Sequence, residues 1–254
     1  MESRRFPSVV LVTGATSGIG SATCIEIAPK VKKIIAIGRN QDRMSSLINR
    51  LSEIKVEVEI QYVDFFNAAS FNNFLEYLSQ SSSEIEGVVH TVGGMHKLSG
   101  LSGWSDYTSA LDLNLGFSHR INIELFKSMT QNDYGKIVHV SSLVTKSGIG
   151  LAPYVVSKSA IESYVVSFSR DISKINSRIN VNCVAPGPID VEHKGLSRLE
   201  KEDKLGLEKW LEEHGVMAGR LGKTKEIARA IDFLLGDGSD FMHGSVLRID
   251  GGGK

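Results

Sequence analysis

Residues 9–20 read Val-Val-Leu-Val-Thr-Gly-Ala-Thr-Ser-Gly-Ile-Gly, and this stretch decides the fold. Its first part, Val9–Thr13, is a short apolar run typical of a buried parallel strand. The glycines that follow permit a tight turn, and a helix that begins there offers free N–H groups to a pyrophosphate. Between a strand and a helix, the turn predicts a dinucleotide-binding site; the alternative is a structural turn without a ligand.

Strand-like and helix-like stretches alternate from this turn to the end of the chain. Further apolar runs predict strands at Ile34–Gly38, Val88–Thr91, Ile137–Ser141 and Ile179–Ala185, and the alternation of apolar residues with glutamates predicts an edge strand at Val56–Val63. Apolar spacings of three and four predict helices over Met44–Ile54, Phe71–Leu78, Ile121–Met129, Ile161–Ile175 and Ile227–Leu235. We therefore predict an α/β protein with a doubly wound Rossmann fold, in which a seven-stranded parallel sheet carries helices on both faces in three αβα layers.

The domain organisation follows from the same rhythm. We expect one domain over residues 1–254, with an insertion at about 191–215 where leucines and Trp210 are interspersed with charges. That pattern predicts a pair of short amphipathic helices. Beyond the carboxyl end of a strand, they would lie over the ligand crevice; the alternative is a surface excursion with its own small core.

The composition excludes several classes of function. The 254 residues include 29 Lys plus Arg and 29 Asp plus Glu, so no basic excess exists to bind nucleic acid. No apolar run approaches the ~20 residues that cross a bilayer. The short run Val9–Val12 lacks the features of a signal peptide, and the two cysteines suit a reducing compartment, so we expect a cytoplasmic protein.

Tyr154 and Lys158 form a candidate catalytic pair in the sequence Tyr-Val-Val-Ser-Lys, at the start of the longest predicted helix. The spacing of four residues places both side chains on one helix face. A phenol with its usual pKa near ~10 is a weak acid–base catalyst at neutral pH, and a nearby ammonium favours the phenolate. The pair therefore predicts a general acid/base for a carbonyl or an alcohol; the alternative is an ordinary surface pair.

The sequence resembles the short-chain dehydrogenase/reductase family in several motifs. These are the glycine spacing, the Tyr-x-x-x-Lys pair, the Asn182–Gly187 stretch and the tail at Gly219–Gly222 and Asp250–Gly252. The resemblance runs from about Val9 to Gly252. It implies that Tyr154 exchanges a proton with the substrate oxygen and that Ser142, with Ser141 as second choice, holds that oxygen. It also implies that Lys158 lowers the pKa of Tyr154 and binds the nicotinamide ribose, and that the backbone carbonyl of Asn114 holds a relay water. Serine capping and a local helix kink at Asn114 are the alternatives.

Arg39 carries the prediction of cofactor type. The position that holds an acidic residue in NAD-preferring sites is Gly38, and the next residue offers a guanidinium to a 2′-phosphate. We therefore expect NADP(H), with NAD(H) possible; the alternative is that Arg39 is a solvated charge. With the resemblance, the expected cofactor-binding set is Gly14, Thr16, Ser17, Gly18, Ile19, Gly20, Arg39, Asn40, Asp64, Phe65, Val92, Gly93, Tyr154, Lys158, Pro186, Gly187 and Ile189.

The sequence also departs from the family pattern. Asn-Asn-Ala-Gly is replaced by His90-Thr91-Val92-Gly93, a common threonine is Val191, and Ser142 precedes Tyr154 by 12 residues where 13 is usual. The altered segment raises a second hypothesis, an NADP(H)-binding sensor or scaffold without turnover. The remaining histidines show no metal-ligand spacing, so we expect no metal; His96 and His193 fall near the expected mouth of the site.

The expected partners follow from the resemblance and the charge balance. They are a small-molecule carbonyl or alcohol and further copies of the chain, with neither nucleic acid nor a membrane. Family members are usually tetramers, with the helices around Asn114–Met129 and Tyr154–Lys174 forming one interface, and we expect a tetramer or dimer here.

Overall fold

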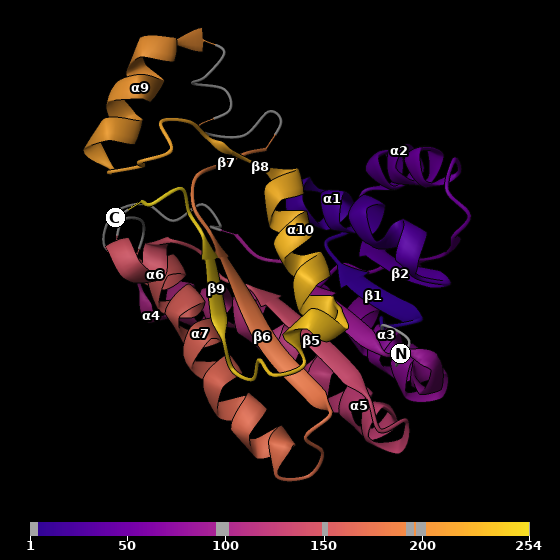
Figure 1. Ribbon diagram of the computed structural model, residues 1–254. Coiled ribbons are helices and arrows are strands. Elements are labelled where there is room, and N and C mark those ends of the chain that lie inside the picture. Colours follow the sequence, from indigo (N-terminus) through magenta and orange to yellow (C-terminus); the bar gives the residue numbers. More distant parts are fainter. Residues whose placement is uncertain (1–4, 95–101, 149–151, 192–195, 197–201, 254) are drawn as a thin grey trace.

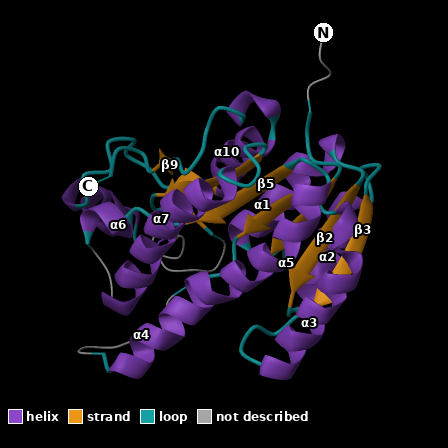
Figure 2. Cartoon of the chain, turned by 90° about the horizontal axis from the view of Figure 1, so that it is seen from below, coloured by secondary structure: helices purple, strands orange, loops and turns teal. Residues whose placement is uncertain are grey.

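The fold is seen in a computed structural model that describes residues 5–94, 102–148, 152–191, 196 and 202–253. Its centre is a sheet of seven parallel strands flanked by helices on both sides (Figures 1 and 2). The spatial order is β3 (Glu57–Tyr62), β2 (Lys33–Gly38), β1 (Val9–Thr13), β4 (Gly87–His90), β5 (Gly135–Val140), β6 (Ile179–Pro186) and β9 (Val246–Ile249). The predicted doubly wound, seven-stranded sheet is confirmed, and the strand order reverses between β1 and β4, where such folds bind ligands.

Two hydrophobic cores fasten the helices to the sheet. On one face, α1 (Gly18–Ile27), α2 (Gln41–Leu51) and α10 (Thr224–Leu235) pack on residues such as Val10, Val12 and Ile34. On the other face, α3 (Ala68–Ser81), α5 (Phe117–Gln131) and α7 (Ala152–Ser173) pack on residues such as Leu11 and Val88. Successive residues of β1 thus serve opposite cores, because side chains alternate along a strand.

The edge position of β3 is confirmed. Glu57 and Glu59 alternate with apolar residues along this strand, and Lys33 on the neighbouring β2 lies 3.5 and 2.6 Å from their carboxylates. Charges of this kind discourage another chain from pairing with the edge. The opposite edge strand, β9, was not among the strands predicted from the sequence.

The remaining elements are short or connect the strands and helices already named. They are η1 (Ala28–Lys30), η2 (Ser82–Glu84), α4 (Trp104–Leu111), the π-helical turn η3 (Asp112–Gly116), α6 (Val144–Ser147), β7 (Ile189–Asp190), α9 (Lys204–Glu213), β8 (Gly222–Lys223) and η4 (Asp237–Ser239). The π-turn joins α4 to α5.

Within the segment predicted to be an insertion, the structure describes α9, which lies beyond the carboxyl ends of β6 and β9 (Figure 1). Leu207 and Leu211 of α9 pack against Val216 and Leu221 in a small separate core. The insertion therefore has the core that we considered as the alternative. Residues 192–195 and 197–201, where the first helix of the expected pair would fall, lie outside the described residues.

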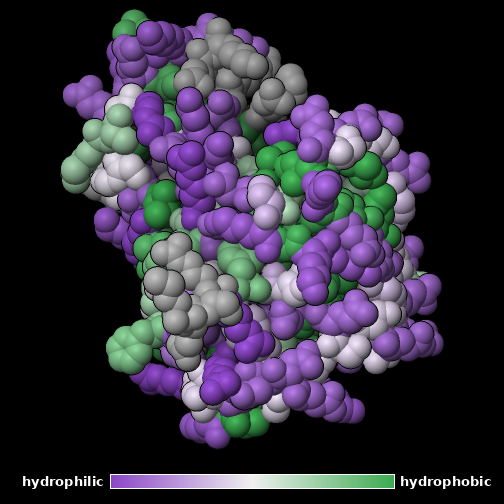
Figure 3. All heavy atoms as spheres, turned by 45° about the vertical axis from the view of Figure 1, so that its right-hand side comes forward, coloured by the Kyte–Doolittle hydropathy of each residue, from purple (hydrophilic) through white to green (hydrophobic). Residues whose placement is uncertain are grey.

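The surface agrees with the balanced composition. The face shown in Figure 3 is mostly hydrophilic, with hydrophobic side chains between the polar ones. Within the described parts of the chain, no helix combines the length and the apolar character needed to cross a bilayer.

Candidate active site

The glycine turn between β1 and α1 is built as the sequence predicts. Gly14 adopts φ +68°, and a Cβ there would lie 2.7 Å from Thr91 Oγ1, so a larger residue would collide with the neighbouring strand end. A Cβ at Gly20 would overlap the Gly14 carbonyl oxygen. The Ala15 N–H donates to the Ile37 carbonyl at 2.9 Å, which ties the turn to the end of β2. The turn thus lies close-packed at the switch point of the sheet.

A cleft of about 730 Å³ extends from this turn towards α7. Ten of the residues predicted to bind the cofactor line it: Gly14, Thr16, Ser17, Arg39, Asn40, Asp64, Phe65, Val92, Gly93 and Tyr154. The cleft therefore joins the phosphate turn, the predicted cofactor-discriminating arginine and the predicted catalytic tyrosine.

Other predicted cofactor residues lie beside this cleft and do not line it. Gly18 faces an adjoining cavity of about 610 Å³ that Thr16 and Ser17 share. Gly187 and Ile189 face a small cavity of about 60 Å³ near Asp250, while Pro186 and Gly20 are buried. The contact of these positions with a cofactor stays a prediction.

Arg39 lies at the end of β2 with its guanidinium 3.9 Å from the Asp64 carboxylate, and both side chains are exposed. Arg43 also lines the cleft and was not predicted. It follows Arg39 by four residues and lies in the first turn of α2. The Asn40 side chain accepts from the Arg43 N–H at 2.8 Å, so Asn40 caps α2.

Gly38 packs against the phosphate turn. A Cβ at this position would lie 2.5 Å from Thr16 Cγ2 and 2.8 Å from Thr16 Oγ1. The position that is acidic in NAD-preferring sites therefore has no space for a side chain unless Thr16 moves.

Tyr154 lies in the first turn of α7, and Ser142 follows the end of β5. Burial raises the pKa of the Tyr154 phenol, whereas its hydrogen bond with Ser142 lowers it. Ser142 Oγ also accepts from the Val144 N–H at 3.4 Å, a long contact consistent with the capping alternative. The structure thus joins the two predicted partners of a substrate oxygen, despite the shortened segment between them.

Lys158 is buried one turn further along the same face of α7. Its ammonium donates to the Val140 carbonyl at 2.8 Å and lies 5.8 Å from the centre of the Tyr154 ring. Burial lowers the pKa of Lys158 to about 8. We expected Lys158 to lower the pKa of Tyr154. In the structure that pKa is raised, because burial of the phenol outweighs its hydrogen bond with Ser142.

Asn114 lies within the π-turn and not in a regular helix. Its Oδ1 accepts from the Gly94 N–H at 3.1 Å, and its Nδ2 donates to the Ala110 carbonyl at 2.9 Å. A Cβ at Gly93 would lie 2.5 Å from Asn114 Oδ1 and 3.0 Å from Lys158 Nζ. The side chain thus anchors the Gly93–Gly94 backbone beside Lys158, and the local helix irregularity that we held as the alternative is also present.

The altered segment is braced by other hydrogen bonds. His90 Nε2 lies 2.7 Å from Asn122 Oδ1, and Asn122 Nδ2 lies 3.1 Å from His139 Nε2. Thr91 Oγ1 donates to the Thr13 carbonyl at 2.6 Å. These bonds join β4 to α5, β5 and β1, so the departures from the family pattern leave this part of the sheet held together.

Two other expectations concern histidines and metal. Within the described residues, no group of three or more histidine, cysteine or acidic side chains could hold a metal ion. His96 and His193 lie outside the described residues.

The comparisons with known proteins agree with this geometry. The family model for short-chain dehydrogenases matches residues 8–202. A 3-oxoacyl-acyl-carrier-protein reductase of Chlamydia trachomatis is 31% identical over 251 residues, which covers 95% of each chain, and that of Pseudomonas aeruginosa is 27% identical over 247 residues, covering 96% of each.

Solved structures share the fold. An L-sorbose reductase from Gluconobacter frateurii superposes with a TM-score of 0.87 at 23% identity, covering 99% of this chain and 98% of the other. A xylitol dehydrogenase gives a TM-score of 0.83 at 24% identity, covering 97% and 99%.

Proposed function

The chain belongs to the short-chain dehydrogenase family of oxidoreductases, and from that premise we propose that it interconverts a carbonyl and a secondary alcohol with NADP(H). The observation that carries the proposal is the position of Tyr154. This residue lines the same cleft as the glycine turn and Arg39, is hydrogen-bonded with Ser142, and precedes Lys158 by one turn of α7.

The residues present fit a nicotinamide dinucleotide. At Gly14, Gly93 and Gly94 the absence of a side chain lets a ligand in the cleft approach the backbone closely. A Cβ at Gly14 or Gly93 would also meet neighbouring atoms. The N-terminal turn of α1 favours a pyrophosphate, because unpaired N–H groups and the helix dipole act together there. When bound, the nicotinamide supplies or accepts the hydride.

The chain's own residues manage the proton. In the direction of reduction, the Tyr154 hydroxyl gives its proton to the carbonyl oxygen as hydride reaches the carbonyl carbon, and in oxidation it takes the proton back. Ser142 donates to the same oxygen and orients it. Lys158 binds the ribose, and its cationic form favours the phenolate. Asn114 supports this group through the Gly93–Gly94 backbone and, as the family resemblance implies, through a relay water.

Arg39 supports the preference for NADP(H). Its guanidinium and that of Arg43 line the cleft at the end of β2, where the adenosine ribose of a Rossmann ligand lies. Two guanidinium groups offer charge-assisted hydrogen bonds to a 2′-phosphate. Asp64 and Phe65 lie next to them and fit the adenine contact that the resemblance implies.

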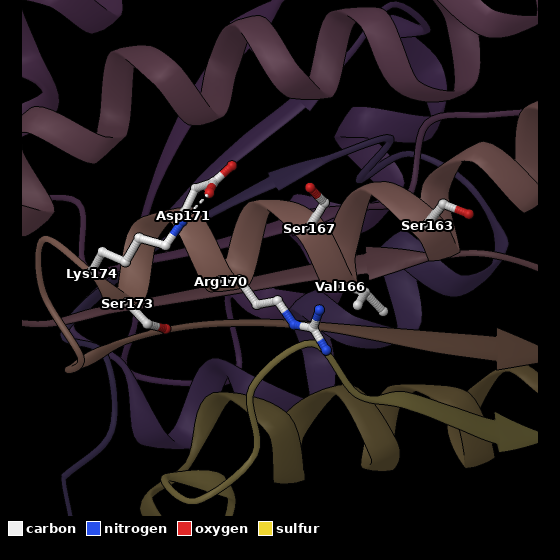
Figure 4. A pocket seen from close by; sticks show the side chains of 7 residues that line it. All are labelled: Ser163, Val166, Ser167, Arg170, Asp171, Ser173 and Lys174. Carbon is white, nitrogen blue, oxygen red and sulfur yellow. Dashed lines mark hydrogen bonds and ion pairs between the residues drawn. The ribbon is translucent and has the colours of Figure 1, made fainter.

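A homo-oligomer is part of the proposal. An open groove of about 800 Å³ lies on the outer face of α7, where Ser163 and Ser167 point to one side and Val166 and Arg170 to the other (Figure 4). Its lining combines short side chains with the longer Arg170, Asp171 and Lys174. Short side chains let a second helix approach closely. We propose that α5 and α7 of one copy pack against those of another.

The test is cofactor oxidation against a panel of carbonyl compounds, beginning with a 3-oxoacyl thioester because the curated relatives carry that name. Tyr154→Phe should reduce turnover by about 10²-fold or more, since it removes the exchangeable proton. NADPH binding, measured by fluorescence titration, should change little. Tyr107→Phe, which removes a phenol hydroxyl on α4, serves as the matched control.

Two results would contradict the proposal. Full turnover by Tyr154→Phe would remove the acid/base role from this residue. Tight NADPH binding without reduction of any carbonyl or oxidation of any alcohol would favour the sensor or scaffold hypothesis instead.

A further inference from the structure

Glu162 connects three separate elements beside the proposed active site. It lies on α7, four residues after Lys158, and its side chain is mostly buried. Glu162 Oε1 accepts from the Thr145 hydroxyl at 2.7 Å and from the Ser141 hydroxyl at 3.0 Å. Glu162 Oε2 accepts from Arg248 Nη2 of β9 at 3.0 Å.

These contacts enclose the turn that carries Ser142. Ser141 precedes that residue, and the Thr145 hydroxyl lies 3.0 Å from the Ser142 carbonyl oxygen. Arg248 Nη1 also donates to Thr145 Oγ1 at 3.3 Å, so the guanidinium binds both Glu162 and Thr145. The backbone on either side is tied to β6 and its end, where Ser141 N–H donates to Val184 and Leu143 N–H to Pro186.

Burial and charge give this arrangement stiffness. The Ser141 hydroxyl is buried, and its second acceptor is the Lys158 carbonyl oxygen at 3.2 Å, on α7 itself. A carboxylate with a bound guanidinium and two hydroxyl donors is satisfied on both oxygens, and hydrogen bonds to a charged acceptor are stronger than neutral ones.

We propose that Glu162 is a positioning residue that fixes the Ser142 turn against α7 and so sets the hydrogen bond between Ser142 and Tyr154. Arg248 completes the arrangement from β9. The inference rests on the proposed function, because Ser142 and Tyr154 are the groups that would touch the substrate oxygen. Neither Glu162 nor Arg248 lines the cleft, so their effect passes through the Ser142 turn.

The experiment compares Glu162→Ala, Glu162→Gln and Arg248→Met with the unmodified protein. Glu162→Ala should lower kcat for carbonyl reduction by about 10- to 100-fold, since misplacement of an orienting group by 1 Å is that costly. The Kd for NADPH should stay unchanged. Glu162→Gln should recover much of the loss because it keeps an acceptor for the two hydroxyls, and Arg248→Met should show an intermediate loss.

The pH profile of alcohol oxidation separates positioning from a general loss of structure. Oxidation requires the Tyr154 phenolate, and the Ser142 hydrogen bond lowers the pKa of that phenol. Weakening the bond should therefore move the rising limb of kcat to higher pH in Glu162→Ala. Glu59→Gln is the matched control: this carboxylate also binds a cation and two other side chains, but it lies on β3 at the far edge of the sheet, and its limb should not move.

The outcomes discriminate between the two proposals. If the unmodified protein turns over no substrate, the proposed function fails and the inference falls with it. If turnover is present but Glu162→Ala keeps its kcat, only the positioning role is overturned. The same holds if kcat falls while the rising limb of the pH profile stays at the same pH. Arg248→Met reaches the same turn from another element, so the comparison survives poor folding of Glu162→Ala.

Discussion

At the residue scale, the proposed preference for NADP(H) depends most directly on Arg39. Arg39→Asp replaces a phosphate-binding cation with a carboxylate beside Asp64, so NADPH should bind about 10-fold more weakly or worse, while NADH binding should hold or improve. The measurement is the ratio of kcat/KM for the two cofactors. Arg178→Gln is the control, because it removes an exposed guanidinium directly before β6, at the opposite ends of the strands. An unchanged ratio for Arg39→Asp would show that its charge is only solvated.

The sequence predicted those site residues that a motif places by spacing alone. Tyr154 and Lys158 share a helix face because four residues make about one turn, and Gly14 follows β1 because the strand ends there. Arg43 was missed because its place in the cleft depends on how α2 leaves β2. The pKa of Tyr154 could not be predicted either, since its direction depends on burial by residues from several elements.

At the element scale, β4, β5 and α5 meet through a buried histidine pair that makes stability depend on pH. The ring centres of His90 and His139 are 4.7 Å apart, and burial lowers the pKa of His90 to about 4 and that of His139 well below its ordinary value. Asn122 satisfies one nitrogen of each ring, and His90 Nδ1 has no partner among the described residues. Both rings therefore fold in the neutral form.

This arrangement predicts acid sensitivity. Below about pH 6.5 each of these histidines binds a proton in the unfolded chain but stays neutral in the folded protein. The free energy of unfolding should therefore fall between pH 6.5 and 4. His90 should contribute up to about 3 kcal/mol to this fall in the free energy of unfolding, because its pKa is lowered from its ordinary value to about 4. His90→Asn should flatten the curve measured by urea unfolding across this range. His214→Gln, outside the pair, should leave the slope alone; equal slopes for all three proteins would contradict the role of His90.

Elements differ in how well the sequence predicts them. β1 was predicted with its observed bounds, and the long helix α7 was predicted from its apolar spacing, because both patterns are local. β9 was missed because four residues with Arg248 among them carry no clear period. The π-turn around Asn114 was not predicted as such, since its extra residue per turn depends on the contacts of Asn114 with Gly94.

At the scale of the whole molecule, assembly is the property that the outer face of α7 should control. Ser167 lies in the open groove of Figure 4, so Ser167→Trp should block close approach of a second helix and reduce the mass measured by size exclusion with light scattering. Ser79→Trp places the same bulk on the exposed part of α3 and should leave the mass unchanged. If the Ser167 variant keeps the mass of the unmodified protein, the interface lies elsewhere.

The contact of Gly38 with Thr16 bears on how this protein could evolve. Rossmann sites that bind NAD(H) often carry an acid at this point, but here the first atom of any side chain would meet a threonine of the phosphate turn. A single substitution at codon 38 therefore requires the Thr16 side chain to shift. A lineage under selection for a different redox pool could acquire an acid at position 38 only if Thr16 also rotated away or became smaller, whereas a change at the exposed position 39 carries no such condition.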